Sequence, residues 1–229
     1  TDPYQPIERE WKIKRSVVEV LAECNHPLTI TTKGALIERD IDLLAPMAAR
    51  RLARVFISIP TLDRELARKL DPRAAAPQRR LALVKLLADA GVPTGVNVAP
   101  VIPQLTDREL ESILEAASAA SARHAGWTML RLPLEVAPLF RDWLAVHYPL
   151  RAGHVMSIVQ QIRGGRDNEP HFHVRMGGQG EFADLVRKRF AVPCKRLGHN
   201  SDREPQLDPT LFKPPSIPGT SSPQLDLFG

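Results

Sequence analysis

Short segments rich in β-forming residues alternate with helical stretches over the first 149 residues, and this alternation limits the fold more than any other feature. Strands are expected at residues 28–31, 54–59, 95–99 and 127–132. Helices are expected at residues 36–52, 63–70, 78–90 and 138–147, with a further one from residue 106. Parallel strands need crossover connections of about a dozen residues, usually helical, so this pattern predicts an α/β fold with a parallel sheet.

Two parallel architectures fit the pattern, a doubly wound sheet and a (β/α) barrel. No G-x-G-x-x-G follows an expected strand, which disfavours a dinucleotide-binding fold. The strands are near-continuous apolar runs, so we expect both faces of the sheet to be buried.

The character of the chain changes after residue 149. Two helices, at residues 151–162 and 182–190, flank a glycine-rich stretch, and residues beyond 198 are rich in Pro, Ser, Asp and Gln. Such a composition cannot bury enough apolar surface to fold alone. We therefore expect a domain at 1–149, a helical extension at 150–198 and a flexible tail at 199–229.

Composition excludes several classes of protein. A net charge of +5 permits a nucleic-acid partner without requiring one, and an aromatic content of 5% disfavours a surface that stacks single strands. Two distant cysteines cannot build a disulfide framework or a site with cysteine ligands alone. With no membrane-length apolar run and no signal peptide, we expect a cytoplasmic protein without a membrane partner.

Polar residues at strand ends are the candidate site residues, because ligands bind at the C-terminal ends of barrel strands. The candidates include Asp2, Lys33, Ser58, Asn97 and Arg131. Each could instead cap a helix or lie in a solvated loop. Lys33 could act as a Schiff-base lysine or as a plain cation facing a carboxylate.

Two other patterns have mainly structural interpretations. Thr106 with Glu109 three residues later predicts a helix-capping box. His171 and His173 would point the same way on a strand, but no further ligands of suitable spacing accompany them. A surface loop is the favoured interpretation of the two histidines.

An ordered series of short motifs carries a family resemblance. These are Thr1-Asp2-Pro3-Tyr4-Gln5-Pro6-Ile7-Glu8, Thr32-Lys33, Arg39-Asp40-Ile41-Asp42-Leu43-Leu44, Ser58 with Thr61-Leu62-Asp63, Asp71-Pro72-Arg73, Arg80-Leu81, Ala90-Gly91-Val92 and Val98-Ala99-Pro100-Val101-Ile102-Pro103. The series resembles radical S-adenosylmethionine proteins of the DNA-repair-photolyase-like group, which is related to spore photoproduct lyase. The resemblance runs to about residue 197.

The resemblance implies a partial (β/α)6 TIM-like barrel that lacks its first strand or strands in this chain. It places Thr1 and Asp2 near the methionine part of S-adenosylmethionine, Lys33 opposite the cofactor carboxylate and Ser58 near the ribose. The strand at residues 92–98 would support the adenine. An amino-acid zwitterion needs both an acceptor and a cation, so these roles are chemically consistent.

The family's C-x3-C-x2-C motif, which holds a [4Fe-4S] cluster, does not occur in this sequence. Thiolates are the ligands that hold such clusters, and Cys24 and Cys194 cannot supply three. In the family the motif lies upstream of the segment matching Thr1, so we expect the chain to be part of a longer protein. The alternative is a relative without a cluster that no longer performs radical chemistry.

The C-terminal sequence Gln224-Leu225-Asp226-Leu227-Phe228 resembles the bacterial sliding-clamp-binding motif. Leu225 belongs to this motif, in which Leu227 and Phe228 would enter an apolar pocket while Gln224 forms a hydrogen bond at its rim. Alternatively, Leu227 and Phe228 fold back on the body of the protein.

Three functions follow as hypotheses. The first is an enzyme that generates a 5′-deoxyadenosyl radical, with lyase or repair chemistry on nucleic acid and an electron donor such as flavodoxin or ferredoxin. By itself this chain would be inactive. The second is a DNA-associated scaffold without a cluster, recruited by its tail. The third is a lyase that uses a Schiff base on Lys33.

Overall fold

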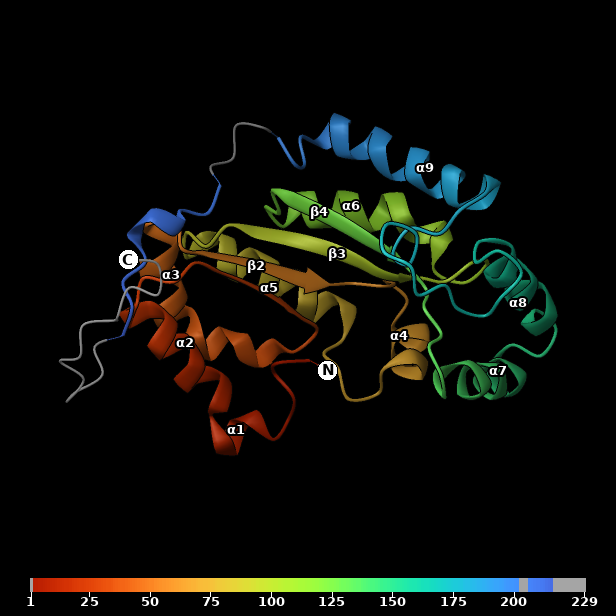
Figure 1. The fold of residues 1–229 in the computed structure, drawn as a ribbon, viewed down its shortest axis with the longest axis horizontal. Coiled ribbons are helices and arrows are strands. Elements are labelled where there is room, and N and C mark those ends of the chain that lie inside the picture. Colours follow the sequence, from red (N-terminus) through yellow and green to blue (C-terminus); the bar gives the residue numbers. More distant parts are fainter. Residues whose placement is uncertain (1, 202–205, 216–229) are drawn as a thin grey trace, which may run out of the picture.

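The central feature of the computed structural model, which describes residues 2–201 and 206–215, is a parallel sheet of four strands. The strands are β1 (Leu28–Thr32), β2 (Ala53–Ser58), β3 (Thr94–Val101) and β4 (His124–Met129), and every neighbouring pair is parallel. Their spatial order follows their sequence order. A doubly wound sheet reverses direction at a switch point. The unreversed order therefore confirms the partial-barrel prediction (Figure 1).

Helices connect the strands and extend the chain beyond them (Figure 1). They are α1 (Glu8–Trp11), α2 (Ile13–Glu23), η1 (Ala35–Asp40), α3 (Ile41–Ala49), α4 (Arg64–Leu70), α5 (Pro77–Asp89), η2 (Asp107–Glu109), α6 (Leu110–Ala119), α7 (Val136–His147), α8 (Ala152–Gln161), α9 (Glu181–Leu197) and η3 (Pro209–Leu211).

Only one face of the sheet is packed throughout. In β1, Leu28, Ile30 and Thr32 are buried while Thr29 and Thr31 are exposed. The buried face joins apolar residues of the helices in the main hydrophobic core. The expectation that both faces are buried is therefore wrong for β1. The threonines face the side that would be the interior of a closed barrel.

Two local predictions are also wrong. The helix expected over residues 36–52 is divided into η1 and α3, because the backbone at Asp40 leaves α-helical geometry and its carboxylate is fully buried. The capping box does not form: the Thr106 hydroxyl accepts a bond from the Ile102 amide (2.8 Å) and donates to the Pro100 carbonyl (3.1 Å). A loop contact has replaced the local cap.

The segment after residue 149 packs against the barrel. Helix α9 lies along α6 (Figure 1), and Ile158, Ala183 and Val186 belong to the same core as the strands. A second apolar cluster joins α7 and α8 to the loops after β3 and β4. Within the described ranges, no helix has the length and apolarity to cross a membrane.

Candidate functional site

A cleft of about 470 Å³ lies at the C-terminal ends of β1 and β2. Its walls include Asp2, Thr32, Lys33, Ser58 and Asp71. Three of the predicted site residues, Asp2, Lys33 and Ser58, therefore share one cleft although up to 56 sequence positions separate them. The parallel sheet brings them together because β1 and β2 end side by side, with Thr32 paired to Ile57.

The Asp2 carboxylate fastens the first residues to the end of β1. It accepts hydrogen bonds from the Thr32 hydroxyl (2.6 Å), the Lys33 amide (2.6 Å) and the Tyr4 amide (2.8 Å). A carboxylate offers about four acceptor positions. Asp2 thus has room for about one more hydrogen-bond donor. Its three bonds hold the first residues of the chain against the end of β1, in the wall of the cleft.

Lys33 supplies a cation inside the cleft. Its ammonium lies 3.8 Å from the Asp71 carboxylate, and its side chain is 34% exposed. A Schiff-base lysine needs a desolvated or cationic environment that removes its proton. The pairing with Asp71 favours instead the plain-cation interpretation of Lys33.

Ser58 ends β2, and Arg80 of α5 holds its backbone. The Arg80 guanidinium is almost fully buried and donates to the carbonyls of Ser58 (2.9 Å) and Ala75 (2.7 Å). Burial lowers the pKa of Arg80, and the charges of Asp71 and Asp2 oppose that effect. The Arg80 side chain thereby fixes both the end of β2 and the 71–76 loop, which forms part of the cleft wall.

Glu109, which is distant in sequence, binds the loop that follows β2. Its carboxylate accepts bonds from the Thr61 hydroxyl and the Leu62 amide, both at 2.7 Å. Thr61 is fully buried. The start of the β2–α4 connection is consequently held to the segment that follows β3.

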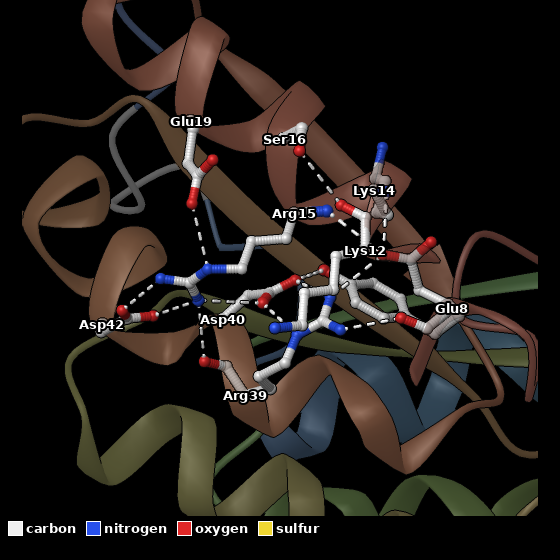
Figure 2. Close-up of polar contacts among 10 residues, drawn as sticks. Glu8, Lys12, Lys14, Arg15, Ser16, Glu19, Arg39, Asp40 and Asp42 are labelled. Atoms are coloured by element: carbon white, nitrogen blue, oxygen red, sulfur yellow. Dashed lines mark hydrogen bonds and ion pairs between the residues drawn. The ribbon is translucent and has the colours of Figure 1, made fainter. Parts of the chain in front are cut away.

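A polar network ties the first helices to η1 and α3 (Figure 2). Asp40 accepts bonds from the Tyr4 hydroxyl (3.0 Å), Arg39 Nε (2.8 Å) and Arg15 Nη1 (3.2 Å). Arg39 also reaches Glu8 Oε1 at 3.1 Å. Four charged side chains thus meet beside Tyr4, and their bonds hold the segment from Tyr4 to α2 against η1.

Burial and hydrogen bonding set the protonation of this network. Burial, together with the Asp40 charge, raises the pKa of Tyr4 far above its usual value. Burial also opposes ionisation of Glu8, but bonds from the Lys14 amide and the Arg39 guanidinium outweigh it and lower the pKa of Glu8. The network therefore holds a neutral Tyr4 phenol and an ionised Glu8 carboxylate at neutral pH.

Asn97 and Arg131 are not among the residues that line this cleft. Asn97 pairs in register with Ser58 on one side and Gly126 on the other, so it continues the same row across the sheet. Arg131 follows β4 and contacts the Met176 sulfur at 3.9 Å. The structure places both at the strand-end side of the sheet, outside the cleft, and their cofactor role stays a prediction.

Arg163 was not predicted from sequence. It is fully buried and donates to the carbonyls of Leu130 (2.6 Å) and Arg175 (2.8 Å). It joins the end of β4 to the loop that carries His171 and His173, which lie exposed as expected. Like Arg80, it is a buried arginine that satisfies carbonyls at a strand end.

The remaining predicted residues lie elsewhere. Thr1 and the tail residues Gln224, Leu225, Leu227 and Phe228 fall outside the described residues. Cys24 and Cys194 are free and buried. Over residues 2–201 and 206–215, no group of three His, Cys, Asp or Glu side chains could hold a metal ion.

Comparison with known proteins identifies the family. The family model described as the radical SAM superfamily matches residues 2–117, about half of the chain. The chain belongs to the radical SAM superfamily.

Several curated relatives are uncharacterized. Proteins from Mycobacterium tuberculosis and Mycobacterium bovis are each 37% identical over 151 residues, which is 65% of this chain and 44% of the relative. A protein of Acidianus two-tailed virus is 32% identical over 108 residues, 47% of this chain and 35% of its own length. The chain thus spans less than half the length of these relatives.

Solved structures of spore photoproduct lyase variants share the fold. One has a TM-score of 0.55 at 15% identity, covering 81% of this chain and 54% of the other. Another, with dinucleoside spore photoproduct, has a TM-score of 0.53 at 15% identity and the same coverage. At this identity the likeness concerns the fold alone, and it supports a TIM-barrel-like arrangement.

Proposed function

We propose that this chain binds S-adenosylmethionine in the cleft at the ends of β1 and β2, as the cofactor-binding part of a radical enzyme. The observation that carries the proposal is the meeting of Lys33, Ser58 and Asp2 in one cleft on a radical SAM barrel. The cleft volume of about 470 Å³ lies in the range of about 300–1,000 Å³ that small-molecule sites occupy.

The donors and acceptors in the cleft suit the cofactor. The Lys33 ammonium can pair with the cofactor carboxylate, and Ser58 can bond a ribose hydroxyl. The acceptor position left on Asp2, or the Asp71 carboxylate, can accept a hydrogen bond from the cofactor ammonium. When bound, the cofactor supplies the radical chemistry, and the residues of the chain bind and orient it.

A [4Fe-4S] cluster does not fit the described residues. It needs several thiolates together. Cys24 ends α2, whereas Cys194 lies in α9, and both are buried. Burial raises the pKa of Cys194 to about 11, which disfavours the thiolate. Because the sequence has only these two cysteines, we infer that the cluster ligands belong to a part of the full-length protein that this sequence does not include.

We further propose that the substrate is nucleic acid and that the chemistry is lyase-like. The fold likeness to spore photoproduct lyase and the net charge of +5 support this substrate class. The radical chemistry would require an electron donor such as flavodoxin or ferredoxin.

The test is reductive cleavage of S-adenosylmethionine by the full-length protein. The protein would be purified without oxygen, reconstituted with iron and sulfide, and reduced with dithionite. We expect 5′-deoxyadenosine and methionine in equal amounts by chromatography. A protein with a fully loaded cluster that forms neither product would overturn the proposal.

We also propose that the C-terminal motif at residues 224–228 binds the bacterial sliding clamp. Its support is the sequence pattern alone. Deleting these five residues from the full-length protein should abolish binding to purified clamp in surface plasmon resonance. Equal binding by the deletion variant and the wild type would exclude this role.

A further inference from the structure

Beside the cofactor cleft lies a second cavity, of about 480 Å³, between α4 and the 71–76 loop. Arg64 and Arg68 line it, while Arg73 lines the cofactor cleft. The two cavities share Asp71 and Ala74. The two cavities are therefore adjacent, one beside α4 and the other at the ends of β1 and β2, and together they are called the groove.

The arginines of this groove lack charge partners. Arg64, Arg68 and Arg73 are exposed, and in the described part of the chain none of the three makes an ion pair or a hydrogen bond through its side chain. The nearby carboxylates already have partners: Glu65 pairs with Lys69 at 2.6 Å, and Asp71 pairs with Lys33.

Asp63, which precedes Arg64, lines neither cavity, and it caps α4 by accepting bonds from the amides of Glu65 and Leu66. Four cationic side chains, on Lys33, Arg64, Arg68 and Arg73, thus line the two cavities together with three carboxylates, on Asp2, Glu65 and Asp71. The groove carries an excess of positive charge, concentrated on guanidinium groups.

We propose that this groove binds the phosphodiester backbone of a nucleic acid and leads it to the cofactor cleft. Guanidinium groups match phosphate oxygens in a two-pronged geometry. Arg64 and Arg68 are four positions apart on one helix face, about 6 Å along the axis, which suits neighbouring phosphates of one strand. This inference rests on the proposed function, because the cofactor that would react with the nucleic acid is proposed to bind at one end of the groove.

The mode of recognition is electrostatic rather than base-specific. Aromatic residues make up only 5% of the chain, and none lines either cavity except Tyr4, which is buried. Contacts to phosphates position a strand without reading its sequence. We expect binding that depends steeply on salt and weakly on sequence.

The experiment measures binding of a fluorescent 20-nucleotide single-stranded DNA to the full-length protein by anisotropy, over a series of salt concentrations. The double variant Arg64→Gln/Arg68→Gln should bind about tenfold more weakly at low salt. Its slope of log K against log salt should be shallower by about 1.4, since each phosphate contact in a single strand contributes about 0.7.

The matched control is Lys188→Gln/Lys195→Gln, which removes two exposed charges from α9 on another side of the molecule (Figure 1). It should bind DNA nearly as the wild type does. Equal weakening in both double variants would overturn the inference, because net charge alone would then explain binding. Equal competition by polyglutamate of matched charge would overturn it as well.

Cleavage of S-adenosylmethionine by the wild type, measured in parallel, separates the two proposals. A protein that cleaves the cofactor but binds no DNA refutes the groove and leaves the proposed binding and cleavage of S-adenosylmethionine standing. A protein that binds DNA through the arginines but never cleaves the cofactor refutes the proposed function instead. The urea unfolding midpoint of each variant, unchanged from the wild type, shows that the effects are local.

Discussion

Replacing Arg80 by methionine should both destabilise the protein and loosen the cleft at the ends of β1 and β2. The change leaves the carbonyls of Ser58 and Ala75 without their donor in a buried place. A hydrogen bond from a charged group contributes about 1.5–3 kcal/mol, so two contribute about 3–6 kcal/mol. Removing a buried cation recovers part of this. We expect a net loss of about 2–4 kcal/mol in the free energy of unfolding.

The neighbouring Arg79 provides a matched control. Its guanidinium is exposed and pairs with Glu38, and surface pairs contribute about 0–1 kcal/mol. Urea unfolding followed by far-UV circular dichroism would compare Arg80→Met with Arg79→Met, and calorimetry would compare their affinities for S-adenosylmethionine. The reasoning is refuted if Arg80→Met loses less than about 1 kcal/mol and keeps wild-type affinity.

Three further perturbations test neighbouring parts of the account. Gly34→Ala would place a methyl group 2.7 Å from the Tyr4 carbonyl, so we expect a loss of about 1–3 kcal/mol in urea unfolding, whereas Gly153→Ala, with no atom near the added carbon, should lose nothing. An equal effect of the two changes would count against the close approach at Gly34. Because burial raises the pKa of Cys194 to about 11, its thiol should resist iodoacetamide at pH 8 in the folded protein and react as the pH approaches 11. Mass spectrometry that finds rapid labelling at pH 8 would contradict that placement. The folded-state pKa of Glu8 is lower than its usual 4.5, so its contribution is present above that pH and lost as the pH falls below it. The stability difference between the wild type and Glu8→Gln should therefore shrink on acidification, and a difference that is constant from pH 7 to pH 3 would refute the role of the Glu8 carboxylate.

The strands and the strand-end residues were predictable from sequence because they depend on local composition and on a general rule for parallel sheets. All four strands were expected, although the last lies at His124–Met129 rather than 127–132. His124, Ala125 and Gly126 have little intrinsic preference for a strand, and pairing with β3 overrides that preference. Lys33 and Ser58 were found because side chains at neighbouring strand ends converge.

The residues that support the cleft depend on partners far away in sequence, so local rules misjudged them. Glu109 fits a capping pattern with Thr106, yet it binds Thr61 and Leu62 instead. Arg80 did leave a signal in the sequence. It lies three, four and seven positions before Leu83, Val84 and Leu87, on the buried stripe of α5. A charged residue on an apolar stripe must find partners inside, although the sequence does not say which.

The central claim is that Lys33 binds the carboxylate of S-adenosylmethionine at the rim of the barrel. Calorimetric titration of the cofactor into the full-length protein tests it most directly, with Lys33→Met compared with Lys85→Met, an exposed lysine on α5. The account predicts that Lys33→Met weakens binding by about tenfold or more, since a charge-assisted bond contributes about 1.5–3 kcal/mol, while Lys85→Met binds as the wild type. Equal affinity in all three proteins would contradict it.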